Sequence, residues 1–311
     1  MRYENLGVGN LQADVITGAG IELFSRRKIY LDPTAGSDGN DGLAITKGKK
    51  TLAAALDKIS TGKSDTIILV QGTSGLSLGA DPAWSYNMTR LIGNAPPGMM
   101  NMRSRIGMST AFSPFITVSG YGNLFANLYT MHGTAAADYI GWLISGSRNV
   151  FKNVHFGGPM NADQGGHASY EGVKITGQEN YFDHCVFGTE TIERDETTPN
   201  VTLGPGTHTI FEDCVFLLMA ADTDPYFVKF TNSSAVTHAD FKRCRFIAMS
   251  SNMAVTPAVA LKFSGGATAL ATFDAECQFI NVTAITVAGS YGYVWVPPGA
   301  ATDKLKSVIL S

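Results

Sequence analysis

The sequence predicts an all-β fold, a parallel β-solenoid in which one chain winds through stacked, similar coils. Three observations predict it: a short motif that recurs every 26 to 32 residues, an apolar run ahead of each copy, and no helical periodicity between the copies. A period in this range is typical of repeat architectures. An array of βαβ units would need a crossover helix of roughly a dozen residues in every period, and the repeat region has none.

The recurring motif begins and ends with Phe. Its copies are spaced by 26, 31, 29, 30 and 32 residues and begin at Phe125, Phe151, Phe182, Phe211, Phe241 and Phe273, where the first copy is weak and the last has one extra residue. The lead Phe, the residue three later and the closing Phe are expected to be buried, and the last two show the alternation of a strand. The two polar residues after the lead Phe suit a tight bend.

Cysteine occupies the same position in four successive copies, at Cys185, Cys214, Cys244 and Cys277. In a parallel stack this position repeats about every 4.8 Å, so we expect a buried ladder of thiols. In-register neighbours are poorly placed for the geometry of a disulfide. A zinc site would need converging ligands, and the sequence has no CxxC spacing. A metal site or a disulfide is the alternative to the core ladder.

The segment ahead of the repeats predicts a strand at residues 28–33, a helix at residues 51–59 and a strand at residues 65–72. Thr51 is expected to cap the helix, whose apolar residues fall on one face. A helix here would close the open end of the solenoid, as terminal caps must. The loop at residues 38–41 is rich in Asp and Asn, and we interpret it as turn chemistry, with calcium binding as the alternative.

These elements predict three parts of the chain: an arm at residues 1–28, the solenoid at residues 29–290, and a cap or tail at residues 291–311. Charged residues make up only 16% of the chain and the net charge is −3, which argues against nucleic acid as the main partner. No run of 18 apolar residues predicts a membrane span. The first residues lack the pattern of a signal peptide.

Apolar residues also recur at positions expected to face outward. They are Leu124, Val150, Tyr181 and Ile210 before the lead Phe, and Val186 and Val215 after the Cys. Exposed aliphatic ladders are uncommon on a monomer. Either the chain's own loops cover them or they form a lateral face between subunits. An irregular Met-rich segment that includes Met99 and Met100 is predicted to contact a neighbouring subunit.

The start of the chain resembles a known superfamily. Residues 30–33, 36–38 and 40–42, the predicted helix and residues 65–67 resemble the N-terminal start of right-handed parallel β-helix proteins of the pectate-lyase-like superfamily, which includes many bacteriophage tailspikes and secreted polysaccharide lyases. With the repeats, the resemblance covers about residues 28–290. It implies a single-stranded right-handed parallel β-helix. It leaves function open, because the superfamily contains enzymes, adhesins and structural proteins.

Weak candidates for catalysis come from one bend. Asp183 and Glu212 share a position in neighbouring coils, with Asp213 beside them, and stacked carboxylates about 5 Å apart would approach the separation in retaining glycosidases. Lys152 and Lys242 hold the same position in other coils, so a charge ladder is the favoured interpretation. His208 and His238 also share a position and are interpreted as surface stacking. No known catalytic motif is present.

Two classes of function follow. The first is a non-catalytic structural protein of a tailed bacteriophage virion, a capsid decoration or head-spike protein, expected to be a homotrimer, to bind capsid or tail proteins and to assemble in the host cytoplasm. Free thiols are compatible with such assembly. The alternative is a tailspike-like enzyme that binds or depolymerises a host surface polysaccharide. The first class predicts no enzyme activity, and neither class requires a cofactor.

Overall fold

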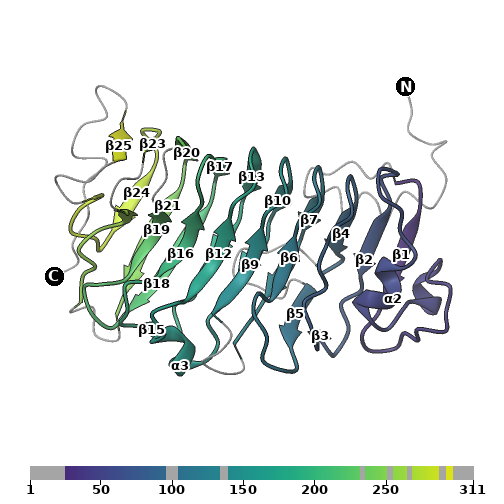
Figure 1. Cartoon of the computed structure of the whole chain (residues 1–311). Coiled ribbons are helices and arrows are strands. Elements are labelled where there is room, and N and C mark those ends of the chain that lie inside the picture. The colour runs from purple at the N-terminus through teal and green to yellow at the C-terminus, as the bar shows by residue number, and fades with distance from the viewer. Residues whose placement is uncertain are drawn as a thin grey trace, which may run out of the picture.

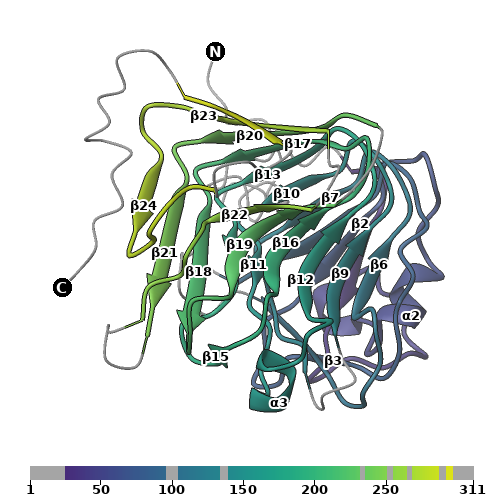
Figure 2. The same cartoon turned by 60° about the vertical axis from the view of Figure 1, so that its left-hand side comes forward.

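The computed structural model describes residues 25–95, 104–133, 139–231, 235–250, 255–264, 268–286 and 292–296. Within them the chain forms a parallel β-solenoid with three long sheets, stacked coil upon coil (Figure 1). The predicted all-β parallel solenoid is confirmed. Figure 2 shows the three sheets as three sides of one elongated body.

Sheet A has ten strands, and each coil adds one strand in parallel to the last. They are β1 (Lys28–Leu31), β2 (Thr66–Leu69), β4 (Arg90–Gly93), β7 (Leu124–Ala126), β10 (Val150–Lys152), β13 (Asn180–Asp183), β17 (His208–Glu212), β20 (Thr237–Lys242), β23 (Ala269–Phe273) and β25 (Gly292–Trp295).

Sheet B follows sheet A after the predicted bend. Its strands are β3 (Leu76–Leu78), β5 (Ser104–Met108), β8 (Leu128–Thr130), β11 (His155–Phe156), β14 (Val186–Phe187), β18 (Val215–Ala220), β21 (Arg245–Met249) and β24 (Gln278–Ile280), and β15 (Glu193–Arg194) pairs with β18.

Sheet C completes each coil before the chain returns to sheet A. Its strands are β6 (Ile116–Val118), β9 (Ile140–Ile144), β12 (Glu171–Ile175), β16 (Pro199–Leu203), β19 (Tyr226–Phe230) and β22 (Leu261–Phe263). The short helices are η3 (Ile45–Lys47), α2 (Leu52–Leu56) and α3 (Ala162–Gly165). No helix in the described ranges is long and apolar enough to span a membrane.

The core of the solenoid is a column of Phe rings. The lead residues of the repeats pair in register, Phe151 with Phe182 and Phe182 with Phe211, and their rings stack with centroids 4.7 and 5.1 Å apart. The closing Phe of each repeat meets this column edge-on, as Phe216 does against Phe211 at 5.5 Å. Both rings are inaccessible to solvent, so each coil buries its aromatic residues against the coils on either side.

The four cysteines lie beside this column as free, buried thiols. Each Sγ lies within hydrogen-bonding distance of the lead Phe carbonyl of the preceding coil, as Cys185 does with Phe151 at 3.3 Å and Cys214 with Phe182 at 3.5 Å. Burial raises the pKa of the Cys214 thiol. A protonated thiol that donates to a backbone carbonyl has no need of a metal ion.

The bend between sheets A and B uses the left-handed backbone conformation in every coil. The residue two after the lead Phe has a φ between 50° and 59°, at Asn127, Asn153, His184, Asp213 and Arg243. Asn and Asp tolerate this conformation better than most residues, whereas His and Arg are less usual there. The conformation repeats because the stacked backbone, rather than the residue type alone, fixes each corner.

The helix near the N-terminus is shorter than predicted. The predicted helix spans residues 51–59, and the structure has one turn, α2, in which the Thr51 hydroxyl accepts a hydrogen bond from the Ala54 N–H. Beyond Leu56 the chain tightens, because the N–H groups of Lys58 and Ile59 bond to carbonyls three residues back. Figure 1 shows α2 beside β1. Its role as a cap of the stack stays a prediction.

The turn from sheet C to sheet A contains a repeated Gly-x-x-Asn motif that the sequence analysis missed. It occurs at Gly120–Asn123, Gly146–Asn149 and Gly177–Asn180. The Asn149 side chain donates to the Gly120 carbonyl at 3.1 Å and accepts from the Asn123 N–H at 2.9 Å. A Cβ at Gly146 would lie 1.8 Å from the Gly120 oxygen, so only Gly allows this stacking.

Candidate functional site

The predicted carboxylates at the A-to-B bend lie in one ion-pair network. Asp183 lies 2.9 Å from Lys152 Nζ. Glu212 accepts a hydrogen bond of 2.6 Å from the Tyr181 hydroxyl and one of 2.5 Å from the Arg243 guanidinium. Asp213 accepts two hydrogen bonds of 2.8 Å from Arg243. Every one of these carboxylates therefore has a cation beside it.

These partners keep the carboxylates ionised. The hydrogen bond from Tyr181, followed by that from Arg243, lowers the pKa of Glu212, and the hydrogen bonds from Arg243 lower the pKa of Asp213. A glycosidase needs one carboxylic acid that stays protonated at the working pH, which requires a raised pKa. The arrangement fits the charge ladder better than a catalytic pair. Asp183, His184 and Asp213 lie close enough to share a metal ion, but Lys152 and Arg243 already neutralise the two carboxylates.

The outward apolar residues divide into two groups. Val186 and Val215 are buried, because they pack on each other and on Leu217, with Ile247 and Met249 against the same cluster. The chain itself covers them, so the interpretation of these two as subunit contacts is wrong. The other group is half-buried on the outer face of sheet A, at Leu124, Val150, Tyr181 and Ile210. A lateral subunit face there stays a prediction. Met99 and Met100 lie outside the described residues.

The acidic loop at residues 38–41 is tied into its own surroundings. The Asp38 carboxylate accepts hydrogen bonds from the Lys50 and Thr51 N–H groups, both at 2.9 Å, and from the Thr51 hydroxyl. Asp41 accepts from the Leu43 N–H at 2.9 Å. Although partial burial opposes it, bonding to Thr51 and Lys50 lowers the pKa of Asp38. These contacts are the turn chemistry that the sequence predicts.

The outer face of sheet C carries a row of lysines, which we call the lysine row: Lys174, Lys229 and Lys262. Lys174 pairs with Thr202, Thr202 with Lys229, and Lys229 with Lys262, so all four residues lie on one line across four coils. Their strand neighbours point into the core: Val173, Val201, Val228 and Leu261 are fully buried. Since strand residues alternate in direction, the lysines point outward. The strands can be followed in Figure 2.

The lysine row is only partly neutralised. Lys174 forms an ion pair of 2.9 Å with Glu171. Within the described ranges, Lys229 and Lys262 have no carboxylate within ion-pair distance. They lie one coil apart, about 4.8 Å at the backbone. Two ammonium groups at this spacing attract an anion with regularly repeated charges.

A row of hydroxyl groups runs parallel to the lysines, two residues further along each strand direction. Its members are Ser119, Ser145, Thr176, Thr231 and Ser264. The ladder extends to them, since the Thr176 N–H bonds to the Ile144 carbonyl and the Ser264 N–H to the Phe230 carbonyl, both at 2.9 Å. The outer face of sheet C is therefore a flat polar surface of cations and hydroxyls that runs along the solenoid.

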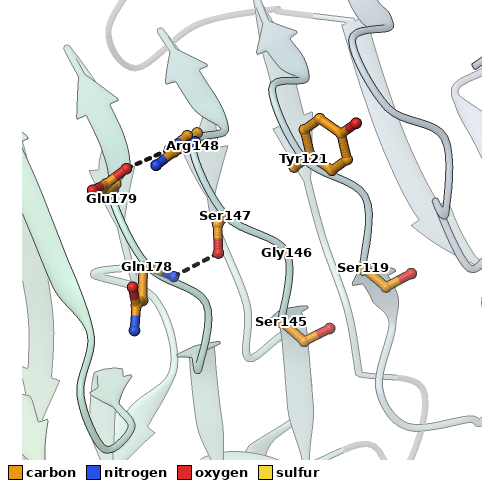
Figure 3. Close-up of a pocket in the computed structure, with 8 residues that line it drawn as sticks. All are labelled: Ser119, Tyr121, Ser145, Gly146, Ser147, Arg148, Gln178 and Glu179. Carbon is orange, nitrogen blue, oxygen red and sulfur yellow. Dashed lines mark hydrogen bonds and ion pairs between the residues drawn. The ribbon is translucent and has the colours of Figure 1, made fainter. Parts of the chain in front are cut away.

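A pocket of about 450 Å³ opens where this face turns toward sheet A (Figure 3). Ser119 and Ser145 belong both to the hydroxyl row and to its lining, which further includes Tyr121, Gly146, Ser147, Arg148, Gln178 and Glu179. Arg148 and Glu179 form an ion pair, and both have left-handed backbones, with φ of 58° and 56°. The hydrogen bond from Arg148 lowers the pKa of Glu179. The pocket offers an aromatic ring and paired charges beside the polar face.

Neither the lysine row nor the pocket was predicted from the sequence. A signal was present, because Val173-Lys174-Ile175, Val228-Lys229-Phe230 and Leu261-Lys262-Phe263 share one pattern, with Lys between two apolar residues. Each pattern alone predicts only a strand. Their alignment in one row depends on the lengths of the intervening loops.

Comparison with known proteins finds relatives of the fold alone. No protein-family model matches the chain, and no curated protein sequence does. Among solved structures, the pectate lyase Pel9A has a TM-score of 0.62 at 15% identity, covering 91% of this chain and 71% of its own. A pectin methylesterase in complex with a hexasaccharide has a TM-score of 0.51 at 14% identity, covering 91% and 93%. The pectin methylesterase PemA from Erwinia chrysanthemi has a TM-score of 0.48 at 17% identity, covering 87% and 81%.

These neighbours correct one prediction. The expectation that the chain is not an enzyme is contradicted, because the solved structures with this fold are a pectate lyase and pectin methylesterases, which are enzymes. Identities of 14 to 17% establish the shared parallel β-helix fold and carry no substrate from one chain to another. The predicted bacteriophage role has no counterpart among these three structures.

Proposed function

We propose that the protein is an enzyme that binds and depolymerises an acidic polysaccharide along the outer face of sheet C. The observation that carries this proposal is the lysine row, in which Lys229 and Lys262 are one coil apart with no carboxylate partner in the described ranges. A uronic acid polymer presents carboxylates at regular intervals along an extended chain. Lysine ammonium groups bind such carboxylates by charge-assisted hydrogen bonds.

The same lysines suit one reaction class, β-elimination. When a base removes the proton next to a uronate carboxylate, negative charge develops on that carbon and spreads into the carboxylate. Cations fixed beside the carboxylate stabilise this charge more strongly than they stabilise the substrate, which lowers the barrier. The hydroxyl row and the pocket in Figure 3 would bind neighbouring sugar hydroxyls. That the fold is shared with a pectate lyase supports this class over hydrolysis, for which no protonated carboxyl was found among the predicted carboxylates.

Replacing both Lys229 and Lys262 with Gln should weaken the binding of polygalacturonate or alginate by about 100-fold, because each charge-assisted hydrogen bond contributes roughly 1.5–3 kcal/mol. Binding is measured by calorimetry, and cleavage by the ultraviolet absorbance of unsaturated uronate ends and by product size. A double variant of the exposed Lys58 and Lys63 to Gln removes the same charge far from sheet C and should leave both unchanged. Equal binding of acidic and neutral polysaccharides by the unmodified protein would refute the proposal.

We further propose, from the resemblance of the N-terminal segment, that this enzyme is part of a bacteriophage particle and acts on a host surface polysaccharide. Quantitative mass spectrometry of purified particles, relative to the major capsid protein, should then detect the chain. A few trimers per particle would place it on a tail or vertex, and hundreds of copies would place it over the capsid. Its absence from washed particles would restrict the proposal to a free enzyme.

A further inference from the structure

Two histidines and one aspartate converge on the outer face of sheet A. His208 on β17 and His238 on β20 pair in register, and their rings are parallel, with centroids 4.7 Å apart. Asp240 lies two residues after His238 on the same strand face. Its Oδ2 is 3.0 Å from His208 Nε2, and its Oδ1 is 3.0 Å from His238 Nε2. One ligand atom from each residue lies within 4.8 Å of the other two.

Hydrogen bonding leaves part of this cluster unused. His208 Nε2 and Asp240 Oδ2 are hydrogen-bonded. His238 Nε2 is shielded from solvent and makes no hydrogen bond of acceptable geometry, although it lies 3.0 Å from Asp240 Oδ1. A buried imidazole nitrogen without such a bond is costly unless something else satisfies it. An ion bound between the two rings and the carboxylate would do so.

We propose that His208, His238 and Asp240 bind a divalent transition-metal ion, with Zn²⁺ as the best fit. Two imidazoles and a carboxylate are ligands that Zn²⁺ accepts, whereas Ca²⁺ and Mg²⁺ prefer oxygen ligands. A tetrahedral zinc ion with bonds of about 2.1 Å holds its ligand atoms about 3.4 Å apart. The two N···O distances of 3.0 Å are close to this value. Three protein ligands leave a fourth position for water or a substrate oxygen.

The surroundings already orient the ligands. All three ligands stand on strands in the middle of a ten-stranded sheet, where the register fixes their positions. The Thr272 hydroxyl, one coil further on, donates a hydrogen bond to Asp240 Oδ1. Such partners beyond the ligands fix carboxylate orientation in metal sites. The site is one coil from the pocket in Figure 3, because Asn180, which follows Glu179, pairs with Thr209, which follows His208.

Calorimetric titration of the full chain with Zn²⁺, after dialysis against a chelator, should show one ion bound per chain, confirmed by elemental analysis. His208→Ala and His238→Ala should each weaken binding by at least about 100-fold, and Thr272→Val by about 10-fold, the range expected for a group that orients a ligand. His167→Gln removes a half-buried imidazole outside the cluster and should leave the affinity unchanged.

The proposal is independent of polysaccharide cleavage, since its readout is metal binding. Zinc affinity in the His208→Ala and His238→Ala variants equal to that of the unmodified chain would overturn it. If a variant fails to fold, NMR of the imidazole groups in the unmodified chain decides: Zn²⁺ should shift the signals of His208 and His238 and not that of His167. A shift at other histidines only, or at none, would equally overturn it.

Discussion

Replacing Phe211 with Ala should lower the free energy of unfolding by about 3–5 kcal/mol, the cost typical of deleting a buried Phe ring. Phe211 is inaccessible to solvent and stacks between Phe182 and Phe241, with both centroid distances 5.1 Å. A cavity in this column removes contacts with the coil before and the coil after. Since each coil of a solenoid is stabilised by its neighbours, one substitution in the middle weakens two interfaces.

Chemical denaturation followed by circular dichroism measures this effect. Phe211→Leu keeps most of the apolar volume and should cost less than half as much. Val236, which is 61% exposed, provides the surface control, because Val236→Ala should change stability by no more than about 0.5 kcal/mol. A loss below about 1 kcal/mol for Phe211→Ala would show that the coils do not depend on the Phe column.

Replacing Asn149 with Leu should cost about 2–4 kcal/mol. The Asn149 side chain is fully buried and bridges three coils: it accepts from the Asn123 N–H and donates to the Gly120 carbonyl and to Asn180 Oδ1. Leu has a similar size but no polar atoms, so it leaves a backbone donor and a backbone acceptor buried without partners. Each such group costs roughly 1–3 kcal/mol.

The same denaturation experiment tests this prediction. Gln178→Leu makes the matched change from carboxamide to isobutyl at an exposed side chain one coil away, and should leave stability within about 0.5 kcal/mol. Hydrogen exchange should also show faster opening at the C-to-A turns in Asn149→Leu, since these turns lose their cross-coil hydrogen bonds. Equal stability of the two variants would mean that the Asn side chains do not hold the turns together.

The fold could be predicted from the sequence because its signals are local and repeated. The lead Phe and the Cys three residues later recur at nearly constant spacing, and this spacing alone places them in one column once the coils stack. The bend after the lead Phe follows from the polar residues there. Helix α2 was predicted too long, because the continuation of a helix past Leu56 depends on what the next residues contact rather than on the apolar pattern.

The tertiary structure decided which side chains meet across coils. Lys229 and Lys262 are 33 residues apart in the sequence, and only the register of β19 with β22 places them side by side. His208 and His238 were recognised as a pair, but Asp240 joins them because residues two apart on a strand face the same way. Val186 was predicted to face a partner, yet its own coils cover it. The repeat in the sequence therefore determined the solenoid, whereas loop lengths, which set the register and the cover of each face, decided where its charged and polar groups gather.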